Sequence, residues 1–223
     1  MSVIDERSRK SLTELFQKNL VDEVKLIVFT QEFECGSCKE TRDLVQELAA
    51  LSNKIKYEVY DFQRDGAKAS ELQIDKIPAV VVVVKKLYGI RFFGLPTGYE
   101  FLALVEDIVD VSKSASRLSD TTRNRVRAVS NPAHIQVFTT PTCPYCPRAV
   151  RTAHQLALEN ELVKADMVNA VEFPHLTTKY NVMAVPKIVV NEVHEFIGSL
   201  PEDQIMDQVM LGLGTPSGSE SGI

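Results

Sequence analysis

Short apolar runs of strand length alternate with amphipathic stretches along the chain. In the first half, the runs that we expect to form strands are 25–30, 55–62 and 79–84. Their counterparts in the second half are 134–139, 163–170 and 187–190. After the third run of each half, a further strand is expected to close a hairpin. The five valines at 80–84 fit a sheet that is covered on both faces.

Helical spacing of apolar residues appears between the expected strands. Apolar residues recur at this spacing from Leu44 to Leu51, which predicts a helix over 38–51. The other helices that we expect are 5–19, 67–72, a segment from Glu100, 119–129, 146–158, 174–180 and a segment from Glu202. Each half thus has the order strand–helix–strand–helix–strand–strand–helix. Strand–helix–strand units favour parallel pairing with right-handed crossovers, so the predicted fold class is α/β.

The chain is a tandem repeat with an offset of 108 residues. Three pairs of positions share this offset: Cys35 and Cys143, Cys38 and Cys146, and Pro78 and Pro186. Agreement of three separate anchors is improbable by chance, so the halves are one fold used twice. We expect two domains, each a central four-stranded mixed sheet flanked by helices. Their expected bounds are 1–115 and 116–212, and a flexible Gly/Ser-rich tail follows at 213–223.

Composition narrows the class of protein. Hydrophobic residues make up 44% of the 223-residue chain and charged residues 25%, which allows a buried core. The net charge of −5 argues against a nucleic-acid-binding surface, which needs a basic face. No apolar run reaches the roughly 18 residues that a membrane-spanning helix needs, and the N-terminus lacks the apolar stretch of a secretory signal. We therefore expect a soluble, cytoplasmic monomer that binds neither nucleic acid nor membrane.

All four cysteines lie in two Cys-x-x-Cys pairs. In a cytosolic chain this spacing indicates redox chemistry or metal binding. A cysteine at the start of a helix has its thiolate favoured by free backbone N–H groups and the helix dipole. The thiolate attacks disulfides, and a second cysteine one turn later can close the ring. We therefore expect Cys35 and Cys143 to be nucleophiles, and Cys38 and Cys146 to be resolving residues.

A proline starts the third strand of each half, 43 residues after the first cysteine. A cis bond at Ile77-Pro78 or Val185-Pro186 would turn the chain sharply toward the cysteines. The residue before each proline would then offer backbone groups to an extended substrate strand. We therefore expect Ile77, Pro78, Val185 and Pro186 to bind substrate.

The order of strand, Cys-x-x-Cys, helix and Ile/Val-Pro strand resembles the thioredoxin and glutaredoxin superfamily. The CPYC motif at 143–146 is similar to the glutaredoxin active site. Two such units in one chain resemble the protein disulfide oxidoreductases of thermophilic archaea and bacteria, which are relatives of eukaryotic protein disulfide isomerase. The resemblance covers about residues 5–212, and the segments 138–154 and 180–190 match that family closely.

This resemblance implies dithiol–disulfide exchange on proteins, with reduction, oxidation and isomerisation of their disulfides as the activities. It implies no bound cofactor, because redox-active disulfides carry the electrons. An NADPH-dependent flavoprotein of the thioredoxin reductase type is the implied electron donor, and a peroxiredoxin is a further implied partner. Thermophily is also implied by the family.

The sequence departs from the superfamily in one respect. Many thioredoxins carry a buried Asp in the strand before the first cysteine, but neither 25–30 nor 134–139 contains a carboxylate. The candidates to replace this group are Glu47, Glu58, Glu159 and Asp166.

Charges near the two cysteine pairs differ. Glu32 and Glu34 precede Cys35 and disfavour its thiolate, with Lys39 as a partial offset. The second site carries instead Pro144, Tyr145, Arg148 and Arg151. A stabilised thiolate makes a pair the stronger oxidant, so we predict the higher reduction potential for Cys143/Cys146. The alternative is that solvent and salt screen these side chains and the sites differ little.

Three other functions are compatible with parts of the pattern. Four cysteines can bind one zinc ion, but usual gaps between pairs are about 15–20 residues, so we expect no metal. A binding module that kept the fold without catalysis is a second alternative, although both pairs are intact here. A glutaredoxin-like or peroxiredoxin-reducing electron carrier shares the chemistry and differs in its partner.

Overall fold

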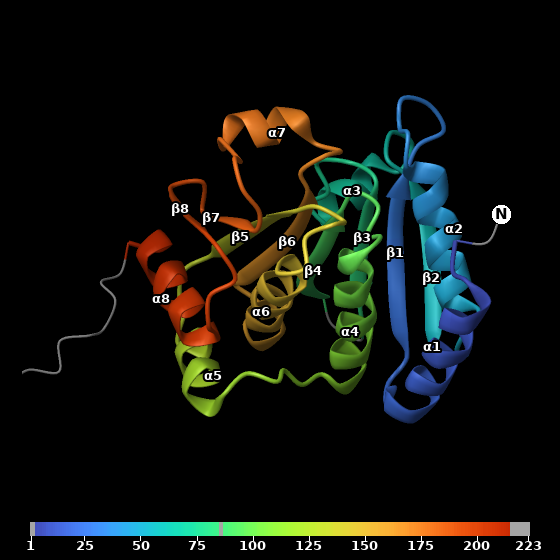
Figure 1. The fold of residues 1–223 in the computed structure, drawn as a ribbon, viewed down its shortest axis with the longest axis horizontal. Coiled ribbons are helices and arrows are strands. Elements are labelled where there is room, and N and C mark those ends of the chain that lie inside the picture. Colours follow the sequence, from blue (N-terminus) through green and yellow to red (C-terminus); the bar gives the residue numbers. More distant parts are fainter. Residues whose placement is uncertain (1–2, 85–86, 215–223) are drawn as a thin grey trace, which may run out of the picture.

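The computed structural model describes residues 3–84 and 87–214 of the chain (Figure 1). Its first half contains α1 (Glu6–Asn19), β1 (Val24–Thr30), α2 (Cys38–Ala49), β2 (Ile55–Asp61), α3 (Gly66–Glu71), β3 (Ala79–Val83), β4 (Leu87–Phe93) and α4 (Tyr99–Lys113). Its second half contains α5 (Asp120–Arg127), β5 (Ala133–Thr139), α6 (Cys146–Glu159), β6 (Val163–Asn169), α7 (Pro174–Lys179), β7 (Lys187–Val190), β8 (His194–Ile197) and α8 (Glu202–Gly212). Each half follows the predicted α/β order.

Side-chain caps explain where the first helix of each half begins. The carboxylate of Asp5 accepts a hydrogen bond from the backbone N–H of Ser8, 3.0 Å away. The hydroxyl of Ser119 accepts one from the N–H of Thr122 at 3.3 Å. Such caps satisfy N–H groups that lack a partner within the helix. The connection between α4 and α5 falls at 114–119, inside the segment where the domain boundary was predicted. Most of the predicted tail, 215–223, lies outside the described residues.

All the described strands belong to one sheet, in the order β2-β1-β3-β4-β6-β5-β7-β8. The four strands of each half are neighbours, as expected, but β4 also pairs in parallel with β6. The expected pair of four-stranded sheets is therefore a single eight-stranded sheet. An unpaired β4 would leave backbone donors and acceptors open beside the buried side chains of Phe92 and Phe93. Pairing with β6 satisfies these groups and removes one free edge from each half.

Strand direction brings the two cysteine loops to the same end of the sheet. Only β3 and β7 run against the other six described strands. As a result β1, β4, β5 and β6 all finish at one end, which we call the carboxyl end. Four strand steps separate β1 from β5. At about 4.8 Å a step, the ends of these two strands lie roughly 19 Å apart.

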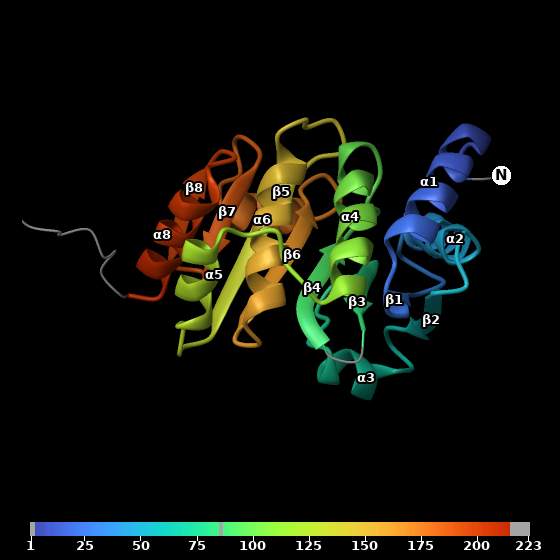
Figure 2. The same ribbon diagram turned by 90° about the horizontal axis from the view of Figure 1, so that it is seen from below.

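Helices cover both faces of the sheet (Figures 1 and 2). On one face α4 and α6 lie side by side, with α1 and α2 beyond α4 (Figure 2). The buried residues on this face include Phe16, Leu48, Leu104 and Leu156, one from each of these helices. A smaller core on the opposite face includes Phe29, Phe93, Phe138, Leu72 and Tyr180, the last two just after α3 and α7. None of the described helices has the length and apolar character that a membrane span requires.

Ion pairs join the halves between α4 and α6. The guanidinium of Arg151 donates to the carboxylates of Asp107 and Asp110, and its Nε lies 2.9 Å from Glu106. The Nδ1 atom of His154 lies 2.5 Å from Asp107. Arg151, Asp107, Asp110 and His154 are all buried, so this contact holds the two halves in one arrangement. His154, for which the sequence suggested a surface position, is fully buried.

Candidate active sites

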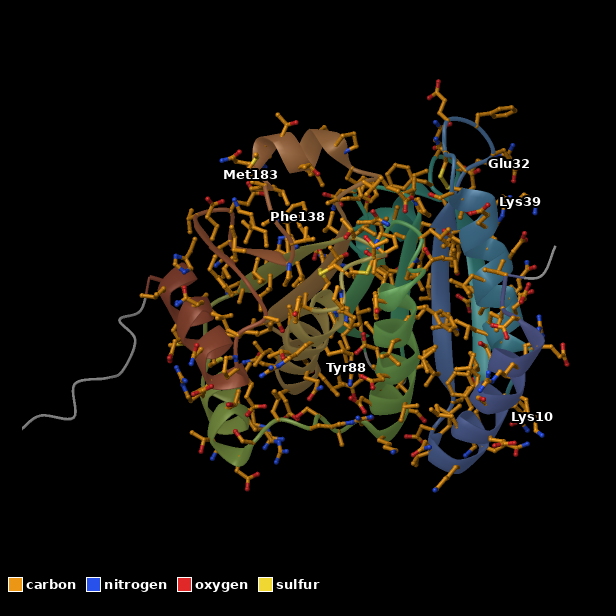
Figure 3. The ribbon with its side chains drawn as sticks, viewed as in Figure 1. Lys10, Glu32, Lys39, Tyr88, Phe138 and Met183 are labelled. Atoms are coloured by element: carbon orange, nitrogen blue, oxygen red, sulfur yellow. A yellow bond between two sulfur atoms is a disulfide. The ribbon has the colours of Figure 1, made fainter. Side chains whose placement is uncertain are left out.

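The first cysteine pair lies between β1 and α2. Cys35 and Cys38 form a disulfide with their Cα atoms 5.5 Å apart. Cys35 is partly exposed, whereas Cys38 is only 1% exposed. Glu32, on the loop after β1, and Lys39, on the first turn of α2, flank this pair (Figure 3). A partner could therefore reach Cys35 and not Cys38.

The second pair has the same arrangement between β5 and α6. Cys143 and Cys146 form a disulfide, also with a Cα separation of 5.5 Å. Cys143 is 7% exposed and Cys146 is fully buried. The backbone N–H of Cys146 donates to the Sγ atom of Cys143 at 3.1 Å. The carbonyl oxygen of Val185 lies 3.8 Å from the same sulfur.

Each helix begins at the second cysteine of its pair, and the first cysteine lies just outside it. α2 starts at Cys38 and α6 at Cys146, so Cys35 and Cys143 precede the first helical residue by three positions. At the second site the free N–H group at the helix start nevertheless points at the first sulfur. The expected electrostatic support for a thiolate is thus present, in the form of a backbone donor.

The two predicted prolines lie beside the cysteine loops. The Ile77-Pro78 and Val185-Pro186 peptide bonds are both cis. β3 starts directly after Pro78, where Ala79 pairs with Phe29 near the end of β1. β7 starts in the same way after Pro186, beside the end of β5. The fold therefore brings each proline to the cysteine pair of its own half.

Most charged residues near the first pair are held by other charges. Glu32 pairs with Arg42 at 2.7 Å, and Lys39 pairs with Asp43 at 2.6 Å. Glu34 is exposed, with a backbone φ of 57°. The offset that we predicted for Lys39 is weakened, because its ammonium group faces Asp43.

Near the second pair, Pro144, Tyr145 and Arg148 are exposed, and the side chain of Tyr145 is 70% exposed. Met183, labelled in Figure 3, is 83% exposed on the segment before the second cis-proline. Arg151 does not act on Cys143 as the sequence suggested, because its guanidinium is buried against α4. The surface around the second pair is accordingly more apolar than around the first.

The carboxylates proposed from the sequence as proton-transfer groups are engaged elsewhere. Glu47 pairs with Arg9, Glu58 with Lys25, Glu159 with Arg127, and Asp166 with Arg91. Burial would raise the pKa of Asp166, but the charge of Arg91 and a hydrogen bond with His134 outweigh it and lower the pKa to about 2. The prediction that one of these four groups serves a cysteine pair is therefore wrong.

A different carboxyl group, Glu100, lies beside the loop of the second pair. It is 1% exposed in the first turn of α4, and its Oε1 atom accepts a hydrogen bond from the hydroxyl of Thr139 at 2.5 Å. The N–H of the preceding residue, Tyr99, donates to the carbonyl of Pro141 at 2.9 Å. The first turn of α4 is thereby packed against the residues that lead from β5 to Cys143.

Burial raises the pKa of Glu100 to about 7, and the charge of Glu172 adds to the effect, while the hydrogen bond from Thr139 opposes it. A carboxyl group with a pKa near neutrality can give and take protons under working conditions. The sequence offered only one sign of this residue, a carboxylate at the start of a largely apolar helix. Its partner lies 39 positions away in the other half, which no local pattern reveals.

Comparison with known proteins agrees with this geometry. A thioredoxin domain family model matches residues 133–211. The structure of a protein disulfide oxidoreductase from Aeropyrum pernix has a TM-score of 0.88 and 32% identity, covering 96% of this chain and 97% of that one. The structure of an alkylhydroperoxide reductase, AhpF, from Enterococcus faecalis has a TM-score of 0.85 and 27% identity, covering 92% and 99%.

A longer relative is an NADH dehydrogenase from Bacillus subtilis, 24% identical over 214 residues. This match covers 96% of the chain but only 39% of the relative, so the chain spans about two fifths of that protein. The likeness to the Aeropyrum pernix oxidoreductase, in contrast, extends over almost the whole of both chains. This chain therefore belongs to the protein disulfide oxidoreductase family.

Proposed function

We propose that the chain exchanges disulfides with protein substrates at two separate sites, with Cys35 and Cys143 as the nucleophiles. The observation that carries this assignment is the exposure of the sulfurs. In both disulfides the first cysteine is the more accessible one, and the second is buried at the start of a helix. Cys38 and Cys146 are accordingly the resolving residues.

Reduction of a substrate begins from the dithiol form of a site. The thiolate of Cys143 attacks one sulfur of the substrate disulfide and forms a mixed disulfide, while the other substrate sulfur leaves as a thiolate. The thiolate of Cys146 then attacks the Sγ atom of Cys143 and releases the second substrate sulfur. Two electrons pass to the substrate, and the site is left as the internal disulfide seen here. Oxidation is the reverse sequence, and isomerisation needs only the first step and its reversal.

The cis-proline segments position the substrate chain. The carbonyl of Val185 lies close to the reacting sulfur and can accept a hydrogen bond from an extended substrate strand. Ile77 occupies the corresponding position in the first half, also partly exposed. Backbone pairing of this kind suits many protein sequences, because it needs no particular substrate side chain.

Glu100 supplies proton exchange for the second site. The buried thiol of Cys146 must lose a proton before it can attack, and a carboxyl group with a pKa of about 7 can accept it. The hydrogen bond of Glu100 with Thr139, four positions before Cys143, supports this role.

The two sites work as separate centres. Roughly 19 Å between the ends of β1 and β5 is too far for one sulfur to reach the other pair, or for all four to hold one zinc ion at about 2.3 Å. A cytoplasmic NADPH-dependent flavoprotein of the thioredoxin reductase type is the proposed electron donor, and a peroxiredoxin is a proposed acceptor. The likeness to an alkylhydroperoxide reductase supports such partners. A glutathione-dependent route is the alternative, favoured by CPYC at 143–146.

Turnover of insulin disulfides tests the proposal. The Cys35→Ser/Cys143→Ser double variant is expected to fall to the uncatalysed rate, while Cys38→Ser and Cys146→Ser are expected to accumulate mixed disulfides. Full turnover by the double variant would show that other groups carry the reaction. Running the assay with glutathione, and then with NADPH and a thioredoxin reductase, distinguishes the two electron donors.

A further inference from the structure

We propose that Glu172, a residue of the second half, is a positioning residue of the first redox site and makes that site the more reducing of the two. The inference rests on the proposed function, because it assumes that Cys35 and Cys38 exchange electrons with substrates. It adds a residue from outside the domain that carries the cysteines.

The carboxylate of Glu172 joins two segments of the first site. One oxygen accepts a hydrogen bond from the hydroxyl of Ser37, which lies between Cys35 and Cys38. The other oxygen accepts one from the backbone N–H of Leu95, 2.7 Å away. The N–H of the adjacent Gly94 donates to the carbonyl of Pro78 at 2.9 Å. One carboxylate therefore ties the Cys-x-x-Cys loop to the strand end that contacts the cis-proline.

The space for this carboxylate depends on a glycine. Gly94 has a φ of +94°, and a Cβ atom there would lie 2.8 Å from the Oε1 atom of Glu172 and 2.6 Å from the side chain of Asn169. A larger residue at 94 would displace the carboxylate or the strand end that bears Asn169. The close approach thus belongs to the fold of the first half and does not depend on Glu172 alone.

The position of Glu172 follows from the joining of the sheets. It lies three residues after the end of β6, and its N–H donates to the carbonyl of Asn169 at 3.2 Å. Because β6 pairs with β4, the loop after β6 is adjacent to the residues that follow β4. The repeat places Arg64 at the equivalent position of the first half, after β2, which is an outer strand of the sheet. The first half consequently cannot make the reciprocal contact with the second site.

The charge of this carboxylate has a predictable effect on the cysteines. Negative charge beside a Cys-x-x-Cys loop disfavours the thiolate of the reduced pair. It therefore favours the disulfide form, so the first pair gives up electrons more readily. At the second site, the N–H of Cys146 acts in the opposite sense on Cys143. The two pairs then differ for reasons that lie in the fold and that salt screens only weakly.

The test uses the full chain with Cys143→Ser/Cys146→Ser, so that only the first pair reports. Equilibration with glutathione buffers and alkylation of Cys35 across pH are measured with and without Glu172→Gln. We expect Glu172→Gln to shift the equilibrium toward the dithiol by about three- to tenfold and to move the alkylation profile to lower pH. Glu14→Gln, an exposed change of equal charge on α1, is expected to alter neither.

Two further variants separate charge from position. Glu172→Asp keeps the charge, so it should leave the alkylation profile in place while slowing turnover. Ser37→Ala removes the hydrogen bond and should slow turnover in the same way. If Glu172→Gln matches Glu14→Gln in both measurements, the inference is overturned. Failure of the parent variant to reduce insulin at all would instead count against the proposed function.

Discussion

Glu100 of the first half accepts a hydrogen bond from Thr139 of the second half at 2.5 Å, where β5 ends and the loop to Cys143 begins. The pair joins a helix and a strand that are far apart in the sequence, and it places a buried carboxyl group beside one redox site and not the other. Its titration should therefore be visible in both stability and activity.

Replacement of Glu100 by Gln should change how stability depends on pH. Because burial raises the pKa of Glu100 from 4.5 to about 7, the protonated form stabilises the folded chain below pH 4.5. This contribution is lost as pH rises through 7, and it amounts to at most about 3 kcal/mol. In urea unfolding of the oxidised protein, Glu100→Gln should match the wild type near pH 4.5 and exceed it at pH 8. An unchanged slope in the variant would contradict the assignment.

The same substitution should alter the second site in activity. With Cys35→Ser/Cys38→Ser, only the second pair turns over, and its rate should show an inflection near pH 7 that Glu100→Gln removes. The first pair, measured with Cys143→Ser/Cys146→Ser, is the control and should keep its own pH profile. A loss of equal size at both sites would indicate a general structural effect.

Removal of Arg151 should destabilise the contact between the halves. Arg151→Met leaves the carboxylates of Asp107 and Asp110 buried without their guanidinium partner, which costs about 3–5 kcal/mol. Arg127→Met is the matched control, because Arg127 is largely exposed and its partner Glu159 also faces Arg123. That change should cost less than about 1 kcal/mol. Denaturant unfolding compares the two, and equal midpoints would exclude a structural role for the buried cluster.

A side chain at position 98 should disturb the second site. Gly98 has a φ of +57°, and a Cβ atom there would lie 2.3 Å from the carbonyl oxygen of Pro141. We expect Gly98→Ala to cost about 1–3 kcal/mol and to slow the second pair more than the first. Gly66→Ala, where a Cβ atom meets nothing within 4 Å, is the control and should be near neutral. Equal effects on both pairs would argue against a local displacement of the loop.

The second pair should have the higher reduction potential, as the charge pattern predicted. The structure replaces one reason for this, since Arg151 is turned away and the N–H of Cys146 supports the sulfur of Cys143 instead. Equilibration of each single-pair variant with glutathione buffers gives the two potentials. A potential for Cys143/Cys146 at or below that of Cys35/Cys38 would refute the prediction.

The sequence by itself determined the features that depend on neighbouring residues. The two Cys-x-x-Cys pairs, the prolines at 78 and 186 and the order of helices and strands all follow from local spacing repeated after 108 residues. Such patterns are informative because helix and strand periodicities involve residues only a few positions apart.

Only the tertiary structure decided how the halves meet. The β4–β6 pairing, the contact of Glu100 with Thr139 and that of Glu172 with Ser37 join residues 39 to 135 positions apart. A tandem repeat predicts two similar units, but each of these contacts occurs once and breaks the symmetry of the repeat. Their physical cause is the packing of one sheet edge against the other, which sets the neighbours of each site and which no local spacing encodes.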